Sequence, residues 1–145
     1  MSRGSCKACS GEWPRKDHFI TDCGGTTAYL HEDQFFIGWT VLVLKRHATE
    51  LFHLSRDERA GLMEEVAYVA SRLAEEFHPI KINYELLGNQ LPHIHWHLIP
   101  RLADDPAPLE PVWRMPHEPR PLPACDREAL AARLRIRFAV GELDK

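Results

Sequence analysis

Residues 93 to 99 constrain the fold and the chemistry of this chain more than any other stretch. They read His-Ile-His-Trp-His-Leu-Ile, so three histidines alternate with apolar residues. Because successive side chains of a β-strand point to opposite faces of a sheet, the alternation predicts a strand with three imidazoles on one face. Gathering polar rings on one face costs stability unless they are used, so we interpret this face as a functional site.

Two chemistries suit such a row of imidazoles. In one, His93, His95 and His97 together supply nitrogen ligands to a single catalytic metal ion that activates water. In the other, one neutral imidazole attacks phosphorus directly, since a histidine with an ordinary pKa of about 6.5 is mostly neutral at pH 7. The residues alone leave both readings open.

Three segments besides this one are expected to form strands. Residues 26–30 and 35–44 are rich in β-branched and aromatic side chains and predict two strands with a turn near Glu32 and Asp33. Residues 80–87 and 91–99 flank a short polar turn and predict an antiparallel hairpin that Pro100 ends.

Two helices complete the expected fold. Ser55 and Glu58 have the spacing of a capping box and open an amphipathic helix over residues 56–78, which Pro79 ends. Asp126 is expected to cap a terminal helix that runs to about Val140. The pattern predicts an α+β fold, with helices packed on one face of an antiparallel sheet.

Length and charge limit the organisation and the partners. A chain of 145 residues has room for one domain, which we divide into an N-terminal arm (1–25), a core (26–101), a Pro-rich loop (102–124) and a C-terminal helix (125–145). The net charge of −3 creates no field that would attract nucleic acid or anionic lipid. The absence of a signal-like or spanning apolar run predicts a cytoplasmic protein without a membrane partner.

Residues 93–99 match every position of the histidine-triad motif, His-φ-His-φ-His-φ-φ, where φ is apolar, and the chain resembles the histidine-triad (HIT) family. The flanking stretches 38–47, 83–89 and 100–101 are also similar to that family. The resemblance implies a nucleotide-phosphate hydrolase or nucleotidyl transferase, with dinucleoside polyphosphates or nucleotidyl esters as substrates. It also implies a homodimer.

The resemblance also implies roles for single residues. His95 would be the nucleophile that forms a nucleotidyl-histidine intermediate, and His97 would contact the phosphoryl or bridging oxygen and assist the leaving group. The polar residues expected to bind substrate are Asn83, Asn89 and Gln90 near the phosphates and Asp33 near the ribose.

Cys6 and Cys9 form a Cys-x-x-Cys pair, which alone is a weak signal of redox or metal chemistry. Zinc-bearing relatives resemble this chain in pairing such cysteines with two histidines, here His47 and His93. A closed tetrahedral site of this kind would hold a structural zinc ion and fix the arm beside the histidine strand. The alternative is two buried thiols and two solvent-facing histidines.

Trp39 marks a departure from the resemblance, because many relatives carry histidine directly after the glycine that corresponds to Gly38. We expect Trp39 in the core rather than stacked on a nucleotide base. Trp113, in the Pro-rich loop, is expected to influence substrate choice. The histidines expected at the surface, outside the site, are His18, His31, His53, His78 and His117. A non-catalytic nucleotide-binding scaffold remains a rival to an enzyme.

Overall fold

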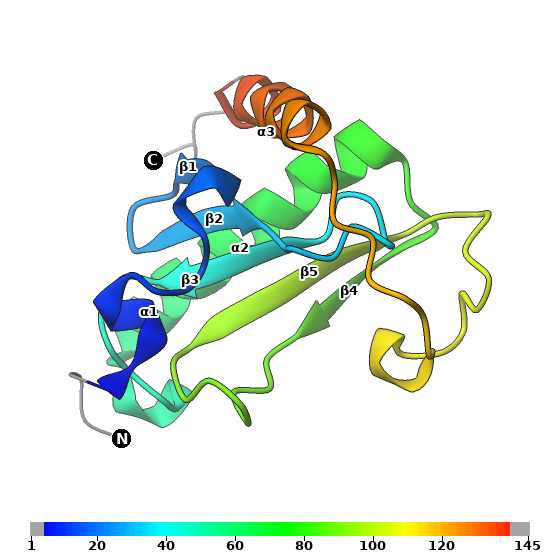
Figure 1. Ribbon diagram of the computed structural model, residues 1–145. Coiled ribbons are helices and arrows are strands. Elements are labelled where there is room, and N and C mark those ends of the chain that lie inside the picture. The colour runs from blue at the N-terminus through cyan, green and yellow to red at the C-terminus, as the bar shows by residue number, and fades with distance from the viewer. Residues whose placement is uncertain (1–4, 140–145) are drawn as a thin grey trace.

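A five-stranded antiparallel sheet with the strand order β1-β2-β3-β5-β4 organises the molecule (Figure 1). The structure is a computed structural model, and it describes residues 5–139. The strands are β1 (Phe19–Asp22), β2 (Thr26–Leu30), β3 (Thr40–Leu44), β4 (Lys81–Glu85) and β5 (His95–Arg101). The helices are α1 (Lys7–Ser10), α2 (Arg56–Phe77) and α3 (Ala124–Ala139), with 3₁₀ turns η2 (Lys16–His18), η3 (Leu51–His53) and η4 (Val112–Arg114).

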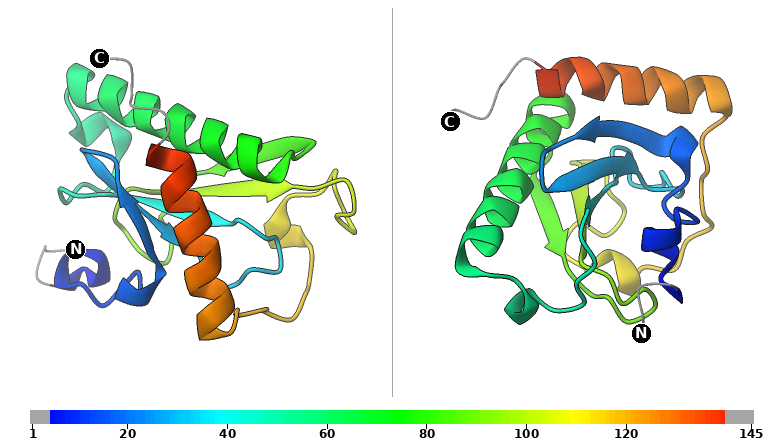
Figure 2. Two further views of the ribbon diagram at one scale, coloured as in Figure 1. Left: turned by 90° about the horizontal axis from the view of Figure 1, so that it is seen from above. Right: turned by 90° about the vertical axis from the view of Figure 1, so that its left-hand side faces the viewer.

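Helices α2 and α3 cover the same face of the sheet, as the sequence predicts (Figure 2). Strand alternation turns Leu42 of β3 and Leu98 of β5 toward these helices, where both are fully buried. The helical side of this core includes Leu62, Val66, Val69, Leu73, Leu130 and Leu134. The opposite face is left for the imidazoles of β5. None of the helices formed by residues 5–139 is both long and apolar enough to span a bilayer.

The capping box at the start of α2 is confirmed. The backbone N–H of Glu58 donates to Ser55 Oγ at 3.2 Å, and the backbone N–H of Ser55 donates to Glu58 Oε2 at 2.7 Å. The helix ends at Phe77, and His78 follows in the left-handed region, with φ +48°. The predicted helix is therefore correct to within one residue.

The strand predicted over residues 35–44 is shorter than expected. Only Thr40–Leu44 form β3, and residues 35–39 make a loop that returns to the sheet through Gly38 at φ +87°. Glycine is required at this position because a Cβ there would lie 2.4 Å from Phe77 Cε2. Buried amide groups hold the loop: Gly38 N–H donates to Gln34 Oε1 at 2.9 Å.

The predicted hairpin has the right partners but the wrong limits. Strand β4 pairs with β5 in an antiparallel register, yet β5 begins at His95 and continues through Pro100 to Arg101. Strand β3 pairs with β5 only as far as Leu98, so at residue 100 the side of β5 that faces β3 has no partner strand. Proline, which has no backbone N–H to donate, is tolerated there. Pro100 therefore does not end the strand.

Three features near the termini also differ from prediction. Strand β1 and the short helix α1 lie in the N-terminal arm, for which no strand or helix was predicted, and β1 pairs with β2. Helix α3 begins at Ala124, so Asp126 lies in its first turn and is not its N-cap. The predicted end of this helix at Val140 lies outside the described residues.

Candidate functional site

The register of β5 carries two imidazoles into one pocket. His95 pairs with Val43 and His97 with Val41 of β3, on the sheet face turned away from α2 and α3, and each is only 6% exposed. The pocket has a volume of about 620 Å³. Its wall combines the N-terminal arm, the loop before β5 and η4: Ser5, Lys7, Trp13, His31, Leu87, Gly88, Asn89, Gln90, Leu91, Pro92, His95, His97 and Trp113.

The protonation of His95 follows from its backbone partner. His95 Nδ1 lies 2.6 Å from the carbonyl oxygen of His93. A carbonyl only accepts, so Nδ1 of His95 carries the proton and Nε2 keeps the lone pair of the neutral ring. Burial lowers the pKa of His95 below its ordinary value, against the opposing effect of this hydrogen bond. The ring is thus held as a neutral base directed by β5.

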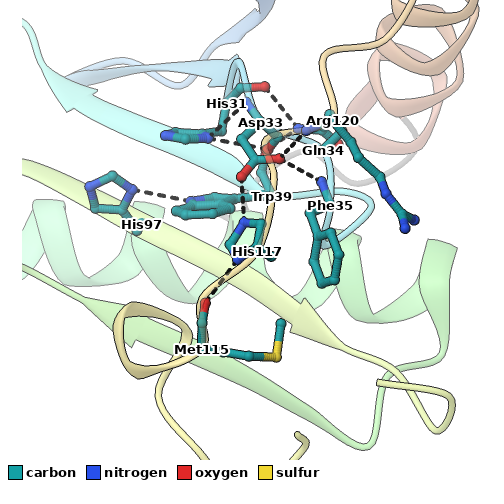
Figure 3. Close-up of polar contacts among 9 residues, drawn as sticks. All are labelled: His31, Asp33, Gln34, Phe35, Trp39, His97, Met115, His117 and Arg120. Atoms are coloured by element: carbon teal, nitrogen blue, oxygen red, sulfur yellow. Dashed lines mark hydrogen bonds and ion pairs between the residues drawn. The ribbon is translucent and has the colours of Figure 1, made fainter. Parts of the chain in front are cut away.

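His97 has the opposite arrangement. The indole Nε1–H of Trp39 donates to His97 Nδ1 at 3.1 Å (Figure 3). Indole nitrogen is a donor only, so Nδ1 of His97 must be the acceptor, and its Nε2 carries the proton. Burial, with smaller repulsion from His95 and His31, lowers the pKa of His97 to about 3. At neutral pH the two β5 histidines therefore offer the pocket one imidazole lone pair and one imidazole N–H.

Trp39 is a core residue, as expected, but its polar end also serves the site. It is 3% exposed and clusters with Phe36, Ile99 and Val112. Its ring stacks on His31 at a centroid distance of 3.9 Å. His31 is half-buried and lines the pocket, so its predicted position at the surface outside the site is wrong. His31 directly follows β2, and its backbone N–H donates to the Trp39 carbonyl oxygen at 2.9 Å. Because Ala28 and Leu30 face the helices, continuing the alternation of β2 by one residue turns His31 to the opposite face, and this is the signal that could have found it.

The other four histidines expected at the surface differ in exposure. His53 and His78 are exposed. His18 is 6% exposed and forms a 3.0 Å hydrogen bond between its Nδ1 and the Leu30 carbonyl, so its surface prediction is wrong. His117 is half-buried, and its Nε2 lies 2.6 Å from Asp33 Oδ2.

The residues predicted to bind substrate do not all reach the pocket. Asn89 and Gln90 line it. Asn83 lies on the same sheet face farther along β4, where its Oδ1 accepts a 2.7 Å hydrogen bond from the buried Arg101 Nη1. Asp33 binds the backbone N–H groups of Phe35 and Arg120 through Oδ1 and His117 through Oδ2. Tertiary contacts thus occupy both Asn83 and Asp33 away from the pocket wall.

Cys6, Cys9, His47 and His93 come together in one cluster, with one ligand atom of each within 4.8 Å of the others. The cluster joins the N-terminal arm to the ends of β3 and β5. His93 Nε2 donates to the Leu44 carbonyl oxygen at 2.6 Å, and this bond turns His93 Nδ1 toward the thiols. His93 therefore points away from the pocket that His95 and His97 share.

The spacing of these atoms fits a tetrahedral metal ion. Ligands at about 2.0–2.1 Å for nitrogen and 2.3 Å for sulfur lie about 3.3–3.8 Å apart along the edges of a tetrahedron. The two Nδ1 atoms of His47 and His93 are 3.3 Å apart, and the sulfur-to-nitrogen distances are 3.5 Å for Cys6–His93, 3.3 Å for Cys9–His47 and 3.7 Å for Cys9–His93. The cluster can therefore hold a metal ion.

Comparisons with known proteins agree with this geometry. The family model of the HIT domain matches residues 14–104. A histidine triad protein from Sinorhizobium meliloti 1021 has 31% identity and a TM-score of 0.75, with coverage of 82% of this chain and 87% of that one. A second, from Bradyrhizobium japonicum, has 29% identity and a TM-score of 0.75, with coverage of 85% and 92%.

A Zn-bound histidine triad family protein from Mycobacterium smegmatis shares the fold, with 23% identity, a TM-score of 0.69 and coverage of 96% of each chain. The search of curated proteins found no match. The family model covers well over half of the chain, and its match includes His95 and His97. The chain therefore belongs to the histidine triad (HIT) family.

Proposed function

We propose that this protein is a nucleotide-phosphate hydrolase or nucleotidyl transferase that works through a covalent nucleotidyl-histidine intermediate on His95. The observation that carries the proposal is the hydrogen bond from His95 Nδ1 to the His93 carbonyl, which leaves a lone pair on Nε2 in a pocket. An uncharged imidazole nitrogen is a competent nucleophile toward phosphorus at neutral pH.

In the first step, the His95 Nε2 lone pair bonds to the α-phosphorus, and the bond from phosphorus to the leaving group breaks. Charge builds on the phosphoryl oxygens as this happens, and fixed hydrogen-bond donors stabilise it. The Nε2–H of His97 is one such donor, and the side-chain amides of Asn89 and Gln90 supply others at the pocket wall. Water or another acceptor then attacks phosphorus and returns the electron pair to His95.

We also propose that the Cys6, Cys9, His47 and His93 cluster holds zinc, which when bound would supply a structural cross-link and no open ligand position. The support is the donor set and its tetrahedral spacing. Helix α1 starts directly after Cys6, and Trp13 follows in the same arm with its ring 5.0 Å from that of His95. The cluster would therefore fix one wall of the pocket.

The rival in which His93, His95 and His97 bind one metal ion finds little support in the geometry. His93 Nδ1 belongs to the cysteine cluster, His95 Nδ1 binds a backbone carbonyl and His97 Nδ1 binds an indole. His95 and His97 therefore share a pocket, whereas His93 Nδ1 faces the two thiols, so the three rings do not converge on one point. The rival of a non-catalytic scaffold is an outcome of the following test.

The test replaces His95 with asparagine and measures hydrolysis of diadenosine tetraphosphate. We expect kcat to fall by at least about 10³-fold because the nucleophile is lost, while nucleotide affinity changes little. His53→Asn is the matched control, since His53 is exposed on η3. An unchanged kcat in His95→Asn would reject His95 as the nucleophile. Nucleotide binding without turnover in the wild-type protein would favour the scaffold.

A further inference from the structure

We propose that Trp39 holds His97 as a neutral hydrogen-bond donor and thereby selects substrates whose leaving group departs as a phosphate anion. Amine leaving groups, which must receive a proton as they depart, are disfavoured. The inference rests on the proposed function and deepens it, because it names the bond that the site cleaves. The class of substrate is a nucleoside polyphosphate or dinucleoside polyphosphate rather than a nucleotidyl amidate.

The direction of one hydrogen bond fixes the tautomer of His97. Trp39 Nε1–H can only donate, and at 3.1 Å it occupies His97 Nδ1. An imidazolium has a proton on both ring nitrogens. To become an imidazolium, His97 would have to set an N–H against the indole N–H and lose this bond. Trp39 thus opposes the charged form of His97.

The indole cannot easily turn away, because its loop is fixed on several sides (Figure 3). His31 stacks on it with an interplanar angle of 8°, and Gln34 Nε2 donates to its carbonyl oxygen at 2.9 Å. Asp33 ties the same loop to the Pro-rich segment through His117 and the backbone N–H of Arg120. Rotating Trp39 would therefore disrupt the packing of its own loop against the Pro-rich segment.

The groups that face His97 add little that would favour a positive charge. The neighbouring rings are His95, His31 and Trp113. Glu85 pairs with His97 across β4 and β5, but its carboxylate accepts a hydrogen bond from Trp113 Nε1. The low pKa of His97, about 3 and caused mainly by burial, agrees with a ring that stays neutral.

A neutral imidazole N–H donates a hydrogen bond but is a poor acid, and this limits the leaving group. When His95 attacks a phosphoanhydride, the bridging P–O bond breaks and its electron pair stays on a phosphate that is stable as an anion. When His95 attacks an amidate, the P–N bond breaks and the nitrogen must gain a proton to leave as an amine. Imidazolium could supply that proton, whereas the neutral N–H of His97 supplies only a hydrogen bond.

The experiment compares diadenosine tetraphosphate with adenosine 5′-phosphoramidate, which give the same adenylyl-histidine and differ in the leaving group. We expect kcat/KM, which reports the step that releases the leaving group, to be at least about 10²-fold higher for the anhydride than for the amidate in the wild-type protein. Trp39→His, whose imidazole can accept as well as donate, should reduce that ratio tenfold or more. Comparing the ratio between variants cancels the intrinsic reactivity of the two substrates.

A second readout measures the tautomer directly, by ¹⁵N chemical shifts of the His97 ring. We expect the proton on Nε2 in the wild-type protein and a mixture of tautomers in Trp39→Phe, which keeps an aromatic ring but lacks the N–H. Trp113→Phe is the matched control and should leave the tautomer unchanged, since the Trp113 N–H binds Glu85. Thermal melts report whether each variant is folded.

Equal kcat/KM values for the two substrates in the wild-type protein, or a proton on His97 Nδ1, would overturn the inference. Its failure is distinguishable from failure of the proposed function. If adenylyl-His95 forms equally fast from both substrates, only the leaving-group inference is wrong. If no adenylyl-histidine forms from either substrate, the proposed function fails, and the inference about the bond cleaved fails with it.

Discussion

At the scale of single residues, the imidazoles of His95 and His97 differ in which nitrogen carries the proton. A backbone carbonyl sets the tautomer of His95, and an indole sets that of His97. Neither partner is reactive, yet each determines whether Nε2 of its histidine presents a lone pair or an N–H to a phosphate. The sequence motif places the imidazoles on one face, but the Trp39 partner is 58 positions away from His97 and follows only from the fold.

The neutral state of His97 predicts how stability depends on pH. Above pH 6.5 the ring is neutral in both the folded and unfolded chain and contributes nothing. Between pH 6.5 and about 3, the unfolded chain gains a proton on this residue that the folded chain resists, because burial lowers the pKa of His97 to about 3. The free energy of unfolding should therefore fall with acid, by up to about 1.4 kcal/mol per pH unit from this group.

Urea unfolding at several pH values checks this contribution. His97→Gln should lose less stability than the wild-type protein between pH 6 and pH 4, since glutamine does not titrate. The comparison removes the effects of the other acidic and histidine groups, which both proteins share. Parallel pH curves for the two proteins would show that His97 is protonated as readily in the folded chain as in the unfolded chain.

At the scale of elements, the sequence predicted correctly those features that depend on neighbouring residues of the chain, such as the start and the buried face of α2. The Ser55–Glu58 capping box and the apolar face of α2 are visible in the sequence because the helix satisfies them within itself. The limits of β3 and β5 are not visible in this way. They depend on where neighbouring strands stop pairing and on how the loop at Gly38 meets Phe77.

The contact at Gly38 supplies a sharp test of this element. Gly38→Ala should destabilise the protein by about 2–5 kcal/mol, because a Cβ would clash with the Phe77 ring at a backbone conformation that alanine resists. Gly61→Ala is the matched control: its Cβ would meet nothing within 4 Å, and alanine favours the helix by about 0.5–1 kcal/mol. Denaturant unfolding measures both. Similar effects of the two substitutions would contradict the packing described at Gly38.

At the scale of the whole molecule, two segments outside the core sequence enclose the pocket. The N-terminal arm contributes Trp13, and the Pro-rich segment contributes Trp113. Buried Arg101 holds the second segment through Asp105 and the carbonyl oxygens of Ala107 and Glu110. The resemblance to zinc-bearing relatives pointed to the cysteine cluster, whereas the engagement of Asn83 and Asp33 elsewhere needed the tertiary structure. The homodimer stays a prediction.

The arm provides a test of zinc binding. The wild-type protein should contain about one zinc ion per chain, and Cys6→Ser should lose most of it because the tetrahedral set is incomplete. Hydrogen exchange at the arm should then become faster, and the melting temperature should fall. Cys125→Ser, at an exposed position in α3, is the control and should keep the metal. Equal metal content in both variants would show that this cluster is not the site.

The most direct test of the central claim is to trap the intermediate. The protein is mixed with diadenosine tetraphosphate labelled at the α-phosphate, quenched in the first turnover under conditions that preserve phosphohistidine bonds, digested and analysed by mass spectrometry. We predict an adenylyl group on the peptide that contains His95, and none on that peptide from His95→Asn. Hydrolysis that proceeds at the same rate with no label on His95, or with label on another residue, would contradict the account.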